Sequence, residues 1–87
     1  MRKLKIFGGT HRVKNNRDQV RMIVGATTKK RAVELINQHT ARITMREFND
    51  YWMETGNDKE VELATNSPET IFYREDRYDS EFISLNP

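Results

Sequence analysis

The chain has 87 residues, of which 36% are hydrophobic and 32% charged, with a net charge of +2 and no cysteine. This length suits one domain, residues 1–87, with a thin core, and the lack of cysteine excludes disulfides and thiolate metal sites. Because no apolar run approaches the ~20 residues that span a bilayer, and no signal-peptide pattern opens the chain, we expect a cytoplasmic protein without membrane contact.

The first part of the chain has the pattern of a β-hairpin. Residues 3–7 alternate in polarity, and Gly8-Gly9 indicates a bulge or a close backbone approach. Asn15-Asn16 suits a two-residue turn, because Asn tolerates positive φ. Residues 19–26 form the best strand, and three of its side chains share one face: Val20, Met22 and Val24.

A two-residue turn would set the register of this hairpin and make one side of its tip strongly basic. Side chains at paired positions share a face of the sheet. Three cross-strand pairs are expected: Lys14 with Arg17, Arg12 with Gln19, and Thr10 with Arg21.

The first expected helix covers residues 29–38 and can be capped by Thr27 or Thr28. Its apolar face comprises Ala32, Val33, Leu35 and Ile36. Three cations lie in its first turn and oppose the helix dipole by about 0.3–1 kcal/mol each when exposed; they are Lys29, Lys30 and Arg31. This departure from a local stability rule points to function, although exposed Lys at a helix start is also common.

Residues 43–56 contain the clearest local signal. Thr44 followed by Glu47 is a capping box, and apolar residues on both sides of the cap suit a hydrophobic staple. The only Trp of the chain, Trp52, falls on the apolar stripe of this helix, which is therefore expected to carry much of the core. Gly56 can take the left-handed conformation that closes a helix.

A short third helix, residues 58–65, follows a second and weaker capping box formed by Asn57 and Glu60. Residues 70–74 and residues 81–85 are expected to be strands. The fold class is then α+β, in the order ββαααββ. The N-terminal hairpin and the C-terminal strands make a small antiparallel sheet, packed by two main helices and the short third.

The charge of the chain is strongly asymmetric. Up to Arg46 there are 12 Lys and Arg against 2 acidic residues, a balance of +10; the rest has 3 against 11, a balance of −8. Such polarity often indicates a charged partner. The alternative is that the two halves fold together and their charges interleave.

No chemistry emerges from the motifs. His11 and His39 lack a second ligand at metal-binding spacing, so we expect neither a metal nor a cofactor. A small ribonuclease of the toxin kind, using His11, is the third alternative. It ranks below the others because those toxins usually open with a helix, whereas this chain opens with a hairpin. Residues 27–52 have a helix-turn-helix outline, but acidic residues on the second helix would meet phosphates badly.

Three runs of the sequence resemble small proteins of tailed bacteriophages: GGTHRVKNNRDQVRMIVGATTKKRAVELI, REFNDYWMETGNDKEVELA and PETIFYR. The most specific parts are Tyr51-Trp52, Thr55-Gly56-Asn57 and residues 64–72. The resemblance implies no activity and no catalytic residue. It implies a setting, the host bacterial cytoplasm, in which small phage proteins commonly bind a host or defence protein.

The resulting expectation is a non-enzymatic phage protein that binds and modulates a bacterial host or defence macromolecule. The alternative is a nucleic-acid-binding protein that uses the basic hairpin and the start of the first helix. In either case the binding residues are expected to form one basic surface, made of His11, Arg12, Lys14, Arg17, Arg21, Lys29, Lys30 and Arg31.

Overall fold

The computed structural model describes residues 3–12, 19–40, 42–74 and 82–85. The described elements are, in order, β1 (Lys5–Arg12), β2 (Gln19–Ala26), α1 (Lys29–His39), α2 (Met45–Tyr51), β3 (Trp52–Glu54), α3 (Asp58–Asn66), β4 (Ile71–Arg74) and β5 (Ile83–Ser84). They confirm the predicted α+β class, with three helices and an antiparallel sheet. The sequence patterns did not indicate β3.

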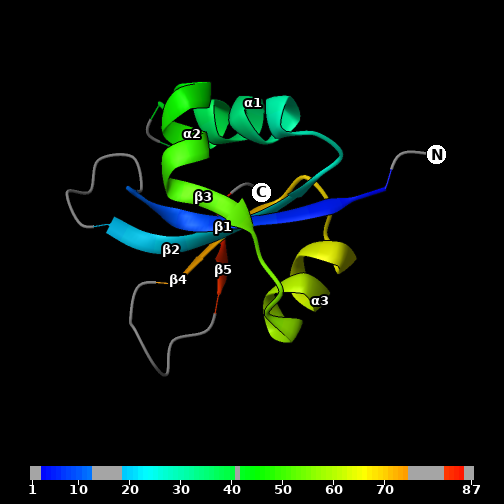
Figure 1. Cartoon of the computed structure of the whole chain (residues 1–87). Coiled ribbons are helices and arrows are strands. Elements are labelled where there is room, and N and C mark those ends of the chain that lie inside the picture. The colour runs from blue at the N-terminus through cyan, green and yellow to red at the C-terminus, as the bar shows by residue number, and fades with distance from the viewer. Residues whose placement is uncertain (1–2, 13–18, 41, 75–81, 86–87) are drawn as a thin grey trace.

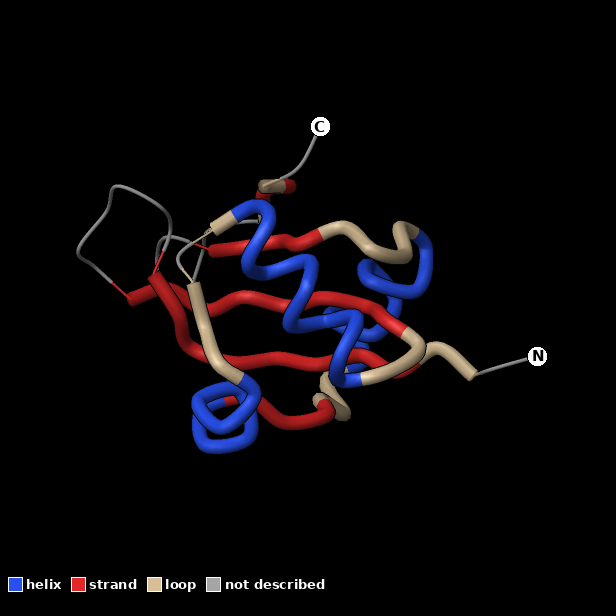
Figure 2. Tube along the Cα trace, turned by 90° about the horizontal axis from the view of Figure 1, so that it is seen from above, coloured by secondary structure: helices blue, strands red, loops and turns tan. Residues whose placement is uncertain are grey.

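The described strands form a five-stranded sheet in the order β3-β1-β2-β4-β5, so the hairpin β1–β2 lies at its centre (Figures 1 and 2). Thr10 pairs with Arg21, and Arg12 with Gln19, which confirms two predicted pairs. The third predicted pair and the Asn15-Asn16 turn fall outside the described residues. The register of β1 with β2 runs unbroken, so Gly8-Gly9 is not a bulge. The predicted close backbone approach is found at Gly9, from the Tyr51 carbonyl, whereas at Gly8 it is the Arg21 side chain that approaches.

The caps of α1 and α2 form as the sequence predicts. The Thr28 side chain accepts a hydrogen bond from the Arg31 N–H, and α1 extends to His39. At α2, Thr44 Oγ1 accepts from the Glu47 N–H at 3.2 Å, and Glu47 Oε1 accepts from the Thr44 N–H at 3.1 Å. This reciprocal pair is the expected capping box, which satisfies two backbone donors that the helix leaves open.

The predicted end of α2 is wrong. The helix stops at Tyr51, and Trp52 is extended, with φ −121° and ψ 148°. Gly56 does not have the positive φ that a left-handed helix cap requires. The cause is tertiary: residues 52–54 pair with β1, which draws the chain out of the helix. As a result α2, with 7 residues, is shorter than α3, with 9.

Helices α1 and α2 cover one face of the sheet, here called the α1/α2 face, and this face holds the main core (Figure 1). Phe48 lies at its centre, with its ring centroid 5.4 Å from that of Phe7 and 5.5 Å from that of Trp52. Such pairs add about 0.5–1.5 kcal/mol beyond burial. Trp52 is 4% exposed, as predicted, and it packs directly over Gly9.

The opposite face, here called the α3 face, is covered by α3 at one end only (Figure 1). A second, smaller core forms there from Ile6, Ile23, Ala64 and Phe72. On the α3 face, none of the described helices lies over the strands towards the tip of the β1–β2 hairpin (Figure 1). None of the described helices is both long enough and apolar enough to cross a membrane.

Candidate functional site

The end of the α3 face that α3 leaves open carries a row of three polar residues across the central strands. Thr10 on β1 pairs with Arg21 on β2, and Arg21 pairs with Arg74 on β4. Paired positions place side chains on the same face. Thr10 is exposed, and both arginines are half-buried. We call these three residues the basic row.

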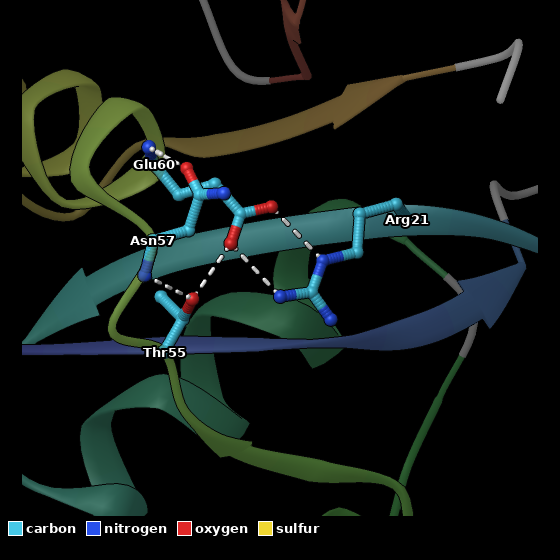
Figure 3. Close-up of polar contacts among 4 residues, drawn as sticks. All are labelled: Arg21, Thr55, Asn57 and Glu60. Atoms are coloured by element: carbon cyan, nitrogen blue, oxygen red, sulfur yellow. Dashed lines mark hydrogen bonds and ion pairs between the residues drawn. The ribbon is translucent and has the colours of Figure 1, made fainter. Parts of the chain in front are cut away.

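Arg21 is held in place by a two-point ion pair with Glu60 of α3 (Figure 3). Arg21 Nε lies 3.0 Å from Glu60 Oε2, and Arg21 Nη2 lies 2.9 Å from Oε1. The Glu60 side chain is 7% exposed and that of Arg21 33%. This side-by-side geometry, the strongest form of charged hydrogen bond, ties the first turn of α3 to the centre of the sheet.

The loop before α3 completes this network (Figure 3). Thr55 Oγ1 donates to Glu60 Oε1 at 2.7 Å and accepts from the Asn57 N–H at 3.2 Å. Asn57 Oδ1 accepts from the Glu60 N–H at 3.1 Å, which is half of the predicted second capping box. The other half is wrong, because the Asn57 N–H bonds to Thr55 and the Glu60 carboxylate turns to Arg21.

The carboxylate of Glu60 is stabilised in its charged form. Burial by itself would raise the pKa of Glu60, but hydrogen bonds from Arg21 and Thr55, with the charges of Arg21 and Arg74, hold this pKa below its ordinary value. In turn, the hydrogen bond with Glu60 raises the pKa of Arg21, against the opposing effect of its burial. Both groups are therefore ionised at neutral pH, and Glu60 is not suited to act as a general base.

Gly8 makes room for the Arg21 guanidinium. A Cβ atom at Gly8 would lie 2.5 Å from Arg21 Nη2, closer than a real contact allows. Gly9 has the same role on the other face, where its Cβ would lie 2.5 Å from Cγ of Trp52. The two adjacent glycines therefore accommodate one large side chain on each side of the sheet.

Arg74, the last residue of the row, stacks on an aromatic ring. Its Cζ atom lies 5.3 Å from the ring centroid of Phe82, within the range of a cation–π interaction. Its Nε is buried and has no hydrogen-bond partner among the described residues. The guanidinium of Arg74 is thus positioned by packing, whereas that of Arg21 is positioned by a carboxylate.

The structure does not bring the described members of the predicted basic surface together. Arg21 faces α3, whereas His11, two residues along β1 from Gly9, belongs to the α1/α2 face. Lys29 follows the far end of β2, and Arg21 is five residues, or about 17 Å along an extended strand, from that end. Lys14, Arg17 and the side chain of Arg12 lie outside the described residues.

Two of the cations at the start of α1, Lys29 and Arg31, contact their own molecule. Arg31 Nε lies 2.6 Å from Glu69 Oε2, and Arg31 Nη1 lies 3.2 Å from Glu34 Oε2. Lys29 Nζ donates to Asn49 Oδ1 at 3.3 Å, and Lys30 is exposed. Arg31–Glu69, like Arg21–Glu60, joins the basic half of the chain to the acidic half, so at these two pairs the charges interleave.

Several residues of this site were not among the predicted binding residues, namely Thr10, Thr55, Glu60 and Arg74. Glu60 was noticed only as a helix-start residue, and nothing local indicates a partner 39 residues away. The one local signal for Arg74 is the alternation of its strand, which places it on the face opposite Ile71 and Tyr73. That Arg74 lies beside Arg21 follows only from the order of the strands in the sheet.

Comparisons with protein families, with curated proteins and with solved structures found no match for this chain. Among the described residues there is also no group of three or more His, Asp or Glu side chains that could hold a metal ion. The site therefore has to be interpreted from its own geometry.

Proposed function

We propose that this protein is a non-enzymatic binding module that presents the basic row to an acidic surface of a bacterial host or defence protein. The observation that carries the proposal is the row itself. Thr10, Arg21 and Arg74 lie side by side on the open end of the α3 face, and both guanidiniums are fixed in advance. A fixed arginine loses less freedom when it binds a carboxylate, which favours affinity.

Both carboxylate oxygens of Glu60 already accept hydrogen bonds, which supports binding rather than catalysis. Glu60 Oε1 accepts from both Arg21 and Thr55, and Oε2 accepts from Arg21. With its pKa lowered, this carboxylate is a poor proton acceptor. Its contacts position Arg21, whose remaining donors can face a partner.

The charge of the row favours a protein over a phosphate backbone. The described cluster contains two arginines and one glutamate, a net charge of +1. Nucleic-acid binding usually requires several uncompensated cations, because each contacted phosphate must be neutralised. Met53 adds an apolar contact: it pairs with Gly8 on β1, belongs to the same face and is 73% exposed. Mixed apolar and arginine surfaces are typical of protein interfaces.

A second candidate is single-stranded nucleic acid on the same surface. The stacking of Arg74 on Phe82 favours it, because aromatic rings and arginines on an open sheet are typical of such sites. The biological setting of the first proposal, a phage protein in the cytoplasm of its bacterial host, rests on the resemblance of the sequence to small phage proteins.

The test is partner capture with charge-reversal variants. Immobilised wild-type protein is incubated with bacterial lysate, retained proteins are identified by mass spectrometry, and the purified partner is titrated against each variant. Arg74→Glu and Thr10→Glu should each weaken binding by more than about tenfold, because they place a negative charge in the row. Lys30→Glu makes the same charge change as Arg74→Glu at an exposed residue of α1, and this variant should bind within about twofold of wild type.

Thermal melts of all three variants identify any loss of fold, and Thr10→Glu is the safer change because Thr10 is exposed. Wild-type affinity in both row variants would refute the proposal. In parallel, labelled random-sequence 20-nucleotide RNA and DNA are titrated at increasing salt. Binding that falls steeply with salt and is lost in Arg74→Glu would establish the second candidate instead.

A further inference from the structure

Strand β3 forms an open edge of the sheet. It is the outermost strand on its side and pairs with β1 alone (Figure 2). The Thr55 N–H donates to the Ile6 carbonyl at 2.9 Å, so these residues form a hydrogen-bonded pair of the antiparallel ladder. Such pairs alternate along a ladder. The backbone groups of Met53 therefore point to β1, and those of Trp52 and Glu54 point away from the sheet.

Three of these outward groups are available for a new strand. The Trp52 N–H is already donated to the Phe48 carbonyl, which ends α2. Within the part of the chain that the structure describes, the Trp52 carbonyl and both backbone groups of Glu54 have no such role. An added antiparallel strand could exchange two hydrogen bonds with Glu54 and donate a third to Trp52, the pattern of β-strand addition.

The side chains along this edge indicate the chemistry of the added strand. Tyr51 is 67% exposed and Met53 73%, both high for large apolar residues. Glu54, on the strand itself, is exposed as well, and so is Asp50, which directly precedes Tyr51 in the sequence. An exposed carboxylate on a strand that also exposes apolar side chains suits a segment that is both apolar and basic.

We infer that β3 is a docking edge for an extended basic segment of a partner protein. The segment adds antiparallel to β3, with a Lys or Arg opposite Glu54 and an apolar residue opposite Met53. Alternation along the strand requires this order, because Glu54 and Met53 belong to opposite faces of the sheet. The edge contains none of the three residues of the basic row, although Met53 lies beside both surfaces, and it does not depend on the function proposed for that row.

A second copy of the chain fits this edge poorly. Twofold pairing in one register would place Glu54 opposite Glu54 of the other copy, with two like charges side by side. In the other registers within β3, Trp52 would face either Glu54 or Trp52 of the other copy, and the Trp52 N–H is already used by Phe48. Each symmetric arrangement therefore loses either charge balance or a hydrogen bond, and a basic segment loses neither.

The probe is a labelled seven-residue peptide of alternating Lys and Val, with an alternating Glu and Val peptide for comparison. We expect the Lys peptide to bind the wild-type protein and to shift the amide resonance of Glu54 in a ¹⁵N NMR titration. Glu54→Lys should weaken this binding by about tenfold or more and improve binding of the Glu peptide. Glu62→Lys makes the same charge change at an exposed residue of α3 and should leave the affinity within about twofold of wild type.

Loss of the peptide N–H groups supplies a second, independent readout. Two methylated forms of the Lys peptide are compared, one with methyl groups on the backbone nitrogens of its Lys residues and one with them on those of its Val residues. The first should not bind and the second should, because only one edge of the added strand faces β3. Equal binding of both methylated peptides, no binding of the Lys peptide at millimolar concentration, or an unchanged affinity in Glu54→Lys would overturn the inference. A concentration-dependent dimer in sedimentation that Glu54→Lys alters would do so as well, since a second copy would then occupy the edge.

Discussion

The two faces of the central hairpin differ in the side chains they carry and in the helices that cover them, although the same strands form both. On the α1/α2 face, β1 and β2 present apolar residues to two helices, and Phe7, Phe48 and Trp52 are nearly inaccessible to solvent. On the α3 face the same strands present Ile6 and Ile23 at one end and Thr10 and Arg21 at the other. The first face is covered by two helices, whereas the second is covered by one helix at one end only (Figure 1).

The difference shows which part of the molecule supplies stability and which part remains for binding. Apolar burial on the α1/α2 face contributes roughly 25 cal/mol for each Å² removed from water. The ion pair of Arg21 with Glu60 has to offset the cost of removing two charges from water, so its net contribution is much smaller. What the pair does provide is position, because it fixes one arginine of the basic row.

The largest expected effect breaks the covered face. Trp52→Ala should lower the free energy of unfolding by about 3–5 kcal/mol, since the indole stacks on Phe48 and fills the space above Gly9. Met53→Ala, one residue along the same strand but 73% exposed, should stay within about 0.5 kcal/mol of wild type. Urea unfolding followed by circular dichroism measures both variants, and similar losses in the two would contradict the assignment of the faces.

A smaller effect is expected from the adjacent glycines, which report on one face each. In Gly9→Ala the new methyl group meets Trp52 ring atoms and the Tyr51 carbonyl within 2.7 Å, so we expect a loss of about 1–3 kcal/mol. In Gly8→Ala the nearest atoms belong to the end of the flexible Arg21 side chain, which can move, so the loss should be smaller. Thermal melts test the order, and a greater loss in Gly8→Ala would reverse the roles given to the two faces.

The smallest effect concerns the polar network and depends on pH. Glu60→Gln should cost about 1–2 kcal/mol near neutral pH, low in the range for charged hydrogen bonds because Arg21 is one-third exposed. The lowered pKa of Glu60 means that its contribution is complete above the ordinary value of 4.5 and is lost as the pH falls through the lower folded value. The stability advantage of wild type over Glu60→Gln should therefore shrink in acid.

Unfolding curves of wild type and Glu60→Gln, measured at about pH 7, 5 and 3, test this dependence. Glu69→Gln is the matched control, because Glu69 also pairs with an arginine but at an exposed site. Exposed pairs contribute little, so this variant should melt close to wild type at pH 7. An advantage over Glu60→Gln that stays constant down to pH 3 would show that Glu60 is not held as a charged partner of Arg21.

The local sequence was sufficient for most of the elements. Thr28 and Thr44 start their helices because a side-chain oxygen reaches a backbone N–H three residues on, an interaction that needs no other part of the chain. The alternating apolar residues of β2 likewise determine which side of that strand enters the main core. The predicted register of Thr10 with Arg21 was correct for the same reason, since neighbouring strands of a hairpin align from their turn.

Tertiary structure decided where α2 ends and where the site lies. The chain leaves the helix at Trp52 because pairing with β1 offers the backbone of the next residue, Met53, an alternative ladder, which no helix-end signal in the sequence reveals. Arg21 meets Glu60, and its neighbour Arg74, only because β4 joins the sheet beside β2 and α3 folds back over the hairpin. Contacts between residues far apart in the chain depend on strand order and packing, and local patterns carry no information about either.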